Sequence, residues 1–273
     1  MRKIILFFML STLTSFASAG NLAVTPMMVE LQAKAGSSSE FEFSVIAESD
    51  STVNLSVFDL AQQVTGHMDF VASEKKDASS GWIKLESNQV KAKGGETTAV
   101  RGIVDIPRNL SGNRFAAIMV EEVKPATVSG GMQVNLRYAV VLNMQIEGPR
   151  RRSIVRSSFE DLRLFKSDDQ YIVEGYYTND STVDGFLHSE VQIRGDGRRL
   201  IDRVTLKTDS SRQREDDGSR VFPGATVRVY GTVSKPLEGT EYMLMARNNF
   251  AGRVQPVSRV DVMLDDREEN ASE

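Results

Sequence analysis

The chain has 273 residues, of which 26% are charged and 40% hydrophobic, and its formal net charge is -4. This balance is typical of a globular protein long enough for two domains, and the slight acidic excess gives no reason to expect nucleic-acid binding. There is no cysteine, which excludes a disulfide scaffold and the usual thiolate zinc sites.

The N-terminal residues predict a cleaved signal peptide over 1–19. Arg2 and Lys3 precede an apolar stretch over residues 4–10, and Ala17-Ser18-Ala19 is the small-x-small pattern that a signal peptidase cleaves. The apolar stretch is too short to cross about 30 Å of hydrocarbon, and no later segment is better suited. We therefore expect a soluble periplasmic protein that begins at Gly20 and has no integral membrane segment.

Residues 20–148 predict a first β-sandwich. Residues 40–46, 51–60 and 98–107 alternate between apolar and polar side chains, as half-buried strands do. Glycine-containing turns separate these runs, and short strands at such spacing favour an immunoglobulin-like sandwich.

Gly148-Pro149 interrupts the alternation, because proline lacks the N–H that a sheet ladder needs. We place a domain boundary here, with a second immunoglobulin-like sandwich over 149–264. Residues 157–166 fit a helix or a strand, and the flanking pattern favours the strand. Residues 209–220 are polar and predict a mobile loop, and the acidic residues 265–273 predict a disordered tail.

The residues offer little catalytic chemistry. His67 and His188 lie in different predicted domains, and neither belongs to a metal-ligand spacing. Adjacent aspartates such as Asp216-Asp217 point to opposite faces of a strand, so they do not converge on one substrate atom. We expect a protein that is not an enzyme and that has no metal or cofactor.

Residues 133–147 (QVNLRYAVVLNMQIE) form an unusually long alternating run. At about 3.3 Å per residue the strand would be roughly 45–50 Å long, which is more than one small sandwich easily covers. Part of the run could lie on an exposed edge that accepts a partner strand. It could equally be a buried last strand that is bent by a bulge. Its apolar face carries Val134, Leu136, Tyr138, Val140, Leu142, Met144 and Ile146.

Five segments of the first half, residues 21–31, 81–83, 90–96, 106–107 and 112–120, occur in a characteristic order. This order resembles the N-terminal domain of periplasmic pilus chaperones, the PapD-like (fimbrial chaperone) family. Residues 179–181, 222–224 and 242–252 are similar to its second domain. The first half is also similar to the immunoglobulin-like peptidoglycan-binding domain found beside WxL surface proteins.

The resemblance to the chaperones implies a function by strand donation. The last strand of the first domain would offer Val134, Leu136, Tyr138, Val140, Leu142 and Met144 to an exported pilus or fibre subunit, and an outer-membrane usher is a further implied partner. The family anchors the subunit's carboxylate with an Arg near the end of the first strand and a Lys at the start of the last strand of that domain. Here Met27 or Met28 occupies the first position, and Arg137 is the only basic residue in the last strand.

A second hypothesis is a cell-envelope module that recognises peptidoglycan or a surface protein. Trp82 and Arg150-Arg151-Arg152 are its candidate contacts, because aromatic and arginine side chains are frequent binding anchors. Core packing is the simpler interpretation of Trp82, since it begins an apolar stretch.

Overall fold

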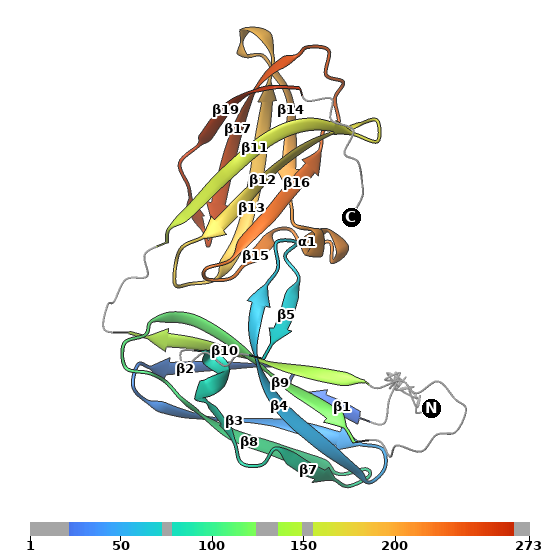
Figure 1. Cartoon of the computed structure of the whole chain (residues 1–273), viewed down its shortest axis with the longest axis vertical. Coiled ribbons are helices and arrows are strands. Elements are labelled where there is room, and N and C mark those ends of the chain that lie inside the picture. The colour runs from blue at the N-terminus through green and yellow to red at the C-terminus, as the bar shows by residue number, and fades with distance from the viewer. Residues whose placement is uncertain (1–21, 73–77, 124–135, 149–154, 265–273) are drawn as a thin grey trace, which may run out of the picture.

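The computed structural model describes residues 22–72, 78–123, 136–148 and 155–264. These residues form two β-sandwiches in tandem (Figure 1), so the predicted all-β, immunoglobulin-like class is confirmed. The predicted signal peptide, residues 149–154 at the predicted domain boundary and the predicted disordered tail lie outside the described residues.

The first sandwich consists of two sheets. One sheet has the order β1-β3-β8-β6 and the other β2-β10-β9-β4-β5, with β7 paired to β4. Its elements are β1 (Leu22–Thr25), β2 (Met28–Lys34), β3 (Ser38–Ala47), β4 (Ser51–Gln62), β5 (Met68–Val71), the 3-10 turn η1 (Ser79–Trp82), β6 (Ile83–Leu85), β7 (Gln89–Ala92), β8 (Thr97–Asp105), β9 (Gly112–Glu122) and β10 (Arg137–Glu147).

The second sandwich also consists of two sheets. One has the order β11-β12-β16 and the other β14-β13-β17-β18, with β15 paired to β13 and β19 paired to β17. Its elements are β11 (Ser157–Ser167), β12 (Gln170–Asn179), β13 (Gly185–Arg194), the 3-10 turn η2 (Asp196–Arg198), β14 (Leu200–Leu206), α1 (Asp209–Gln213), β15 (Ser219–Val221), β16 (Thr226–Thr232), β17 (Glu241–Phe250), β18 (Arg253–Val254) and β19 (Ser258–Met263).

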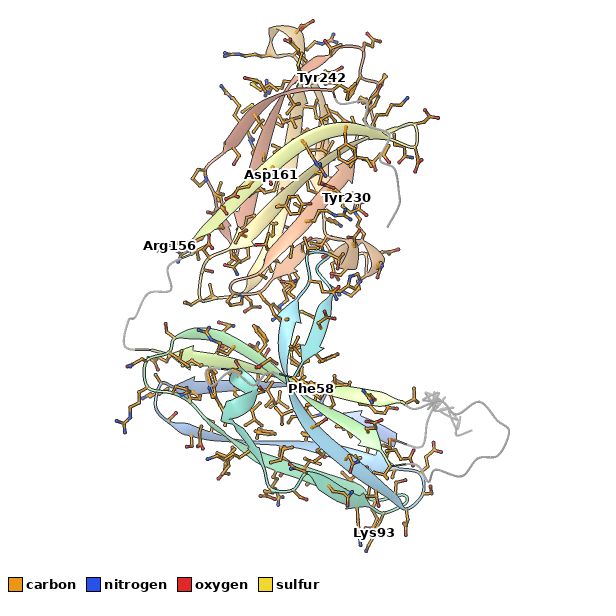
Figure 2. The ribbon with its side chains drawn as sticks, in the orientation of Figure 1. Phe58, Lys93, Arg156, Asp161, Tyr230 and Tyr242 are labelled. Atoms are coloured by element: carbon orange, nitrogen blue, oxygen red, sulfur yellow. The ribbon has the colours of Figure 1, made fainter. Side chains whose placement is uncertain are left out.

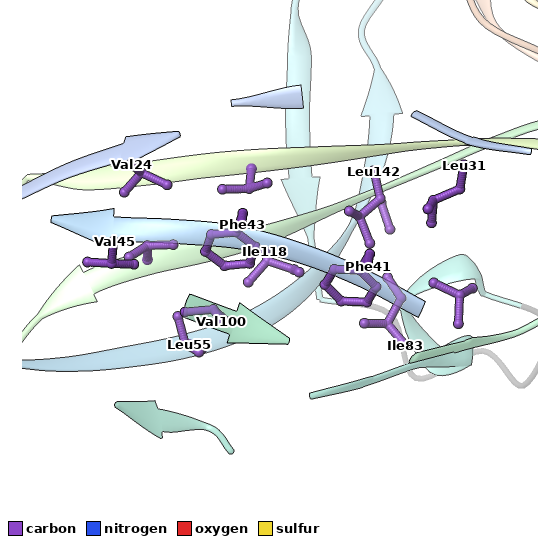
Figure 3. Close-up of a cluster of buried hydrophobic side chains, with 14 of the residues drawn as sticks. Val24, Leu31, Phe41, Phe43, Val45, Leu55, Ile83, Val100, Ile118 and Leu142 are labelled. Atoms are coloured by element: carbon purple, nitrogen blue, oxygen red, sulfur yellow. The ribbon is translucent and has the colours of Figure 1, made fainter. Parts of the chain in front are cut away.

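Side-chain alternation explains why these strands pack as they do. In β3, Phe41, Phe43 and Val45 point into the first core while the residues between them are more exposed (Figure 3). Burying each such side chain contributes about 1.5–3 kcal/mol, so one face of the strand fixes its orientation. Trp82 is buried in the same core, as its apolar context predicted.

Residues 157–167 form a strand, as predicted, but the interpretation of 209–220 as a mobile loop was wrong. α1 and β15 lie there, and Ser210 and Ser211 are buried. The helix is capped by the Thr208 hydroxyl, which accepts a hydrogen bond from the Ser211 N–H at 3.2 Å. It is held in place by the first sandwich, which composition alone does not reveal.

The β4–β5 hairpin leaves the first sandwich near Phe58 and reaches the second beside α1 (Figures 1 and 2). At its tip, the carbonyl of Thr65 accepts a hydrogen bond from the Ser210 N–H at 3.1 Å, and the carbonyl of Val64 accepts one from the Arg228 N–H at 2.7 Å. The Gln62 side chain bonds both the carbonyl of Arg220 and the N–H of Phe222. The hairpin therefore ties the two sandwiches together through main-chain as well as side-chain contacts.

Candidate functional site

The last strand of the first sandwich, β10, lies inside its sheet rather than at the edge for most of its length. It pairs with β9 from Arg137 to Ile146, and with β2 in parallel from Val141 to Glu147. Pairing with β2 begins where the Val141 N–H donates to the Met27 carbonyl at 2.9 Å. Of the two alternatives that the sequence leaves open, the covered strand therefore applies to residues 141–147.

The first part of β10 is different, because the N-terminal strand changes sheet beside it. β1 pairs with β3 in the opposite sheet, whereas β2 pairs with β10, and the change takes place at Pro26 and Met27. In the described part of the chain, no strand pairs with the outer side of Arg137–Val140. We call residues 136–140 the open edge.

The backbone groups at the open edge follow from strand alternation. Val141 bonds toward β2, so Ala139 and Arg137 direct their N–H and C=O groups to the same side, which β2 does not reach. Tyr138 and Val140 direct their N–H and C=O groups toward β9 instead. Unpaired main-chain groups in a row are the feature that accepts an added strand.

The side chains predicted as donated groups divide into two sets. Val140, Leu142 and Met144 are 0% exposed and belong to the first core, where Figure 3 shows Leu142 among its neighbours. Leu136 is 39% exposed, and Tyr138 is half-buried, with its hydroxyl donating to the carbonyl of Leu22 at 2.6 Å. Val134 lies outside the described residues.

The predicted carboxylate anchor, Arg137, stands at the start of the open edge. Its Nε lies 3.1 Å from Oε2 of Glu121 on β9, and its side chain is 60% exposed. An exposed ion pair of this kind contributes little, so another carboxylate can compete with Glu121. Met27 and Met28, which stand at the first anchor position expected from the resemblance, are exposed where β2 begins.

A second feature is a cleft of about 950 Å³ between the sandwiches. Arg114 lines it and makes one hydrogen bond within the described residues, from Nη1 to the carbonyl of Asn113 at 2.8 Å. Burial lowers the pKa of the Arg114 guanidinium below its usual value.

Beside this cleft, two aromatic rings join the sandwiches. Phe115 of β9 and Phe222 stack with ring centroids 4.0 Å apart and an interplanar angle of 10°. Arg220 lies over both rings and forms an ion pair with Asp184 at 2.7 Å. Asp184 also accepts a hydrogen bond from the side chain of Asn113 at 2.7 Å.

Sequence reasoning did not identify this interface, although one signal was present. Arg114 shares the inward-facing parity of β9 with Ala116, Ile118 and Val120, which are all buried. A charged residue next to a run of apolar side chains on one strand face indicates a site at the end of the core. Phe115 carried no comparable signal, because its partner lies more than a hundred residues away.

The other candidate residues do not form a site. Trp82 packs in the core, and Arg150-Arg151-Arg152 lie outside the described residues. His67 bonds Thr65 and Gln213 at the hairpin tip, whereas His188 lies on β13 in the second sandwich. Within the described ranges, no three His, Cys, Asp or Glu side chains are grouped to hold a metal ion. None of the helices in those ranges is both long and apolar enough to cross a membrane.

No protein-family profile and no curated protein matches the sequence. The structure is similar to a chain of a chaperone–tip adhesin complex of CFA/I fimbriae, with 11% identity and a TM-score of 0.48, over 90% of this chain and 99% of that one. It is similar to the class 5 fimbriae chaperone CfaA, with 11% identity and a TM-score of 0.46, over 89% and 99%.

A third similar structure is a chain of the CsuC–CsuE chaperone–tip adhesion subunit pre-assembly complex of Acinetobacter baumannii. It has 14% identity and a TM-score of 0.43, over 77% of this chain and 89% of that one. At such identities and scores, neither a function nor a site passes from these proteins to this chain.

Proposed function

We propose that the protein is a periplasmic chaperone that binds an exported pilus or fibre subunit by strand addition at the open edge. The observation that carries this proposal is that none of the described strands pairs with the outer side of Arg137–Val140, beside the point where the N-terminal strand changes sheet. The order of sequence segments that resembles the PapD-like family supports the same function.

The subunit strand would extend the sheet in the position that β2 occupies further along β10. Main-chain bonds to Arg137 and Ala139 would supply affinity. Inward-facing side chains of the subunit would cover Leu136 and Tyr138, which lie at the border of the core. The side chains of Val140, Leu142 and Met144 are buried in the first core, so they would fix the position of β10 rather than enter the subunit.

This assignment changes how the function should be tested. Replacing Val140 with Asp would place a carboxylate in the core, which would unfold the sandwich whatever its partner. Ala139→Pro is a more specific test, because it removes one N–H group that points away from β9 and leaves the hydrogen bonds between β10 and β9 intact. Ala139→Val is the matched control, since it enlarges the side chain and keeps the N–H.

The experiment is capture of the subunit from the native periplasm with the tagged protein, followed by mass spectrometry. We expect a small exported protein at equal stoichiometry, reduced about tenfold by Ala139→Pro and retained by Ala139→Val, since a lost main-chain bond leaves a subunit carbonyl unpaired. Equal capture by both variants, with circular dichroism showing both folded, would contradict strand addition here.

Arg137 is our proposed anchor for the subunit's C-terminal carboxylate. Arg137→Gln should weaken capture, whereas Glu121→Gln should strengthen it, because the guanidinium would lose the carboxylate that now competes with the subunit. Opposite effects of the two variants support the anchor. If Glu121→Gln weakens capture as Arg137→Gln does, the ion pair only stabilises the strand and the anchor is wrong.

A further inference from the structure

The second sandwich has an open sheet edge of its own, along β19. This strand pairs with β17 over Ser258–Met263. In the described part of the chain no strand pairs with its other side, and the nearby β11 of the opposite sheet is paired to β12. The last strand of the first sandwich, by contrast, is covered by β2 along Val141–Glu147.

Exposed apolar side chains lie along this edge. Val257 is 49% exposed, Val260 38% and Met263 71%. A long exposed edge with apolar side chains is a surface that natural proteins protect or use. Between these apolar residues stand two opposite charges, Arg259 and Asp261, and neither forms an ion pair with another described residue.

Hydrogen bonding shows which backbone groups are free. The Leu264 N–H donates to the Thr240 carbonyl at 2.8 Å, so Leu264 and its even-numbered neighbours along β19 face β17. The odd-numbered residues Arg259, Asp261 and Met263 direct their N–H and C=O groups outward. A partner strand would therefore form its main-chain bonds with these three residues.

The edge is complementary to itself. If two copies pair antiparallel about a two-fold axis through Val260, Arg259 of each copy lies opposite Asp261 of the other, with both side chains on the outer face. The same pairing places Val257 opposite Met263 of the second copy. The backbone groups agree, since odd-numbered residues, whose N–H and C=O groups point outward, lie opposite odd-numbered residues of the second copy.

Other registers lose this match. Centring the pairing on Arg259 places two arginines opposite each other, and centring it on Asp261 places two aspartates opposite each other. Like charges in directly opposed positions are destabilising. Of these three registers, the charge pattern therefore favours antiparallel pairing centred on Val260.

We propose that a second copy of this chain docks on the β19 edge by antiparallel strand pairing centred on Val260. The two sheets that contain β17 and β19 become one sheet that runs through both copies. The interface is distant in the fold from the open edge on β10, so a dimer leaves the proposed subunit site accessible.

The test is sedimentation velocity of the purified protein and of charge variants, over concentrations from about 1 µM to about 1 mM. Arg259→Asp turns both opposed pairs into pairs of aspartates, and Asp261→Arg turns them into pairs of arginines. Each variant should weaken dimerisation about 30-fold, since two cross-strand pairs each change by about 1 kcal/mol. The double variant Arg259→Asp/Asp261→Arg restores both pairs and should dimerise like the original.

Mixing the two single variants gives a sharper readout. Each alone is expected to be monomeric where the original protein is dimeric. Together they should form a heterodimer, because the two aspartates of one copy then face the two arginines of the other. Asp261→Pro, which removes one outward N–H without disturbing the ladder to β17, should also abolish the dimer.

Three results would overturn the proposal. They are a protein that remains monomeric throughout the series, a dimer that survives both single charge reversals, and a double variant that fails to recover. All substituted side chains are exposed, so unchanged thermal midpoints would show that the effects are not due to unfolding. Subunit capture does not involve β19, so its failure and the failure of this proposal are separate outcomes.

Discussion

Truncation of Phe115 to alanine tests whether the two sandwiches unfold as one unit. Phe115 is 7% exposed and Phe222 is 8% exposed, yet neither ring belongs to the buried cluster of its own sandwich. Each ring is thus covered largely by the other, across the interface. Its stabilising effect should therefore appear in the coupling between the sandwiches rather than in the core of either one.

The magnitude follows from the area that the ring buries. A phenylalanine side chain buries about 200 Å², which at about 25 cal/mol per Å² is an upper limit of about 5 kcal/mol. The compactness of the unfolded chain and the methyl group that alanine retains reduce this to about 3 kcal/mol. Ring stacking adds about 1 kcal/mol, so we expect Phe115→Ala to cost about 3–4 kcal/mol.

Differential scanning calorimetry measures this loss, and we expect a single coupled transition to become two separated ones. A double-mutant cycle isolates the cause. Because each ring is stacked on the other, Phe115→Ala/Phe222→Ala should be little worse than either single variant. Phe43→Ala, in the first core, is the control that should lower the transition temperature while leaving the single transition coupled. Strictly additive losses for Phe115 and Phe222 would refute the reasoning.

Two further predictions concern single positions. Gly112 has φ +88°, and a Cβ there would clash with the Thr182 carbonyl. Gly197 has φ +62° but open space around it, so Gly197→Ala should cost roughly 1 kcal/mol in urea unfolding, and Gly112→Ala should cost well over that. Equal losses would contradict this. Burial opposes the ionisation of Asp202, but hydrogen bonds from Ser234, Arg203 and Lys235 outweigh it and hold its pKa below the usual value. The folding stability that the ionised Asp202 contributes is present above its unfolded pKa of about 3.9 and is lost as pH falls through the lower folded pKa. Asp202→Asn should therefore be less stable than the original protein at pH 7, and the difference should disappear in acid. A stability difference that is constant from neutral to acid pH would count against that explanation.

Local patterns predicted the strands and the two-sandwich class because alternation is a property of neighbouring residues. The run around Phe41 and Phe43 needed no tertiary information to be recognised as a strand. The position of a strand in its sheet is different. Nothing in residues 137–147 indicates that β2, more than a hundred residues earlier, pairs with their second half. This long-range pairing covers the second half of the strand, whereas the outer side of the first half has no partner among the described strands.

The same limit applies to the candidate site. Arg137 could be chosen from the sequence because it is the only basic residue of its strand, but its pairing with Glu121 depends on the register between β9 and β10. Residues 209–220 resemble a loop in composition because the sequence does not reveal the hydrogen-bond partners of their polar side chains. Buried hydroxyls of Thr208, Ser210 and Ser211 bond one another beneath the hairpin from the other sandwich.

The change of sheet at Pro26 and Met27 also has a mechanical consequence. In many immunoglobulin domains a disulfide fastens the two sheets of the sandwich to each other, but this chain has no cysteine. Here one continuous N-terminal segment is hydrogen-bonded into one sheet through β1 and into the other through β2. It acts as a main-chain staple, so sliding the sheets past each other requires breaking one of these ladders. The crossing that leaves the outer side of Arg137–Val140 without a partner among the described strands therefore also resists shear, and it does so independently of the redox state of the compartment.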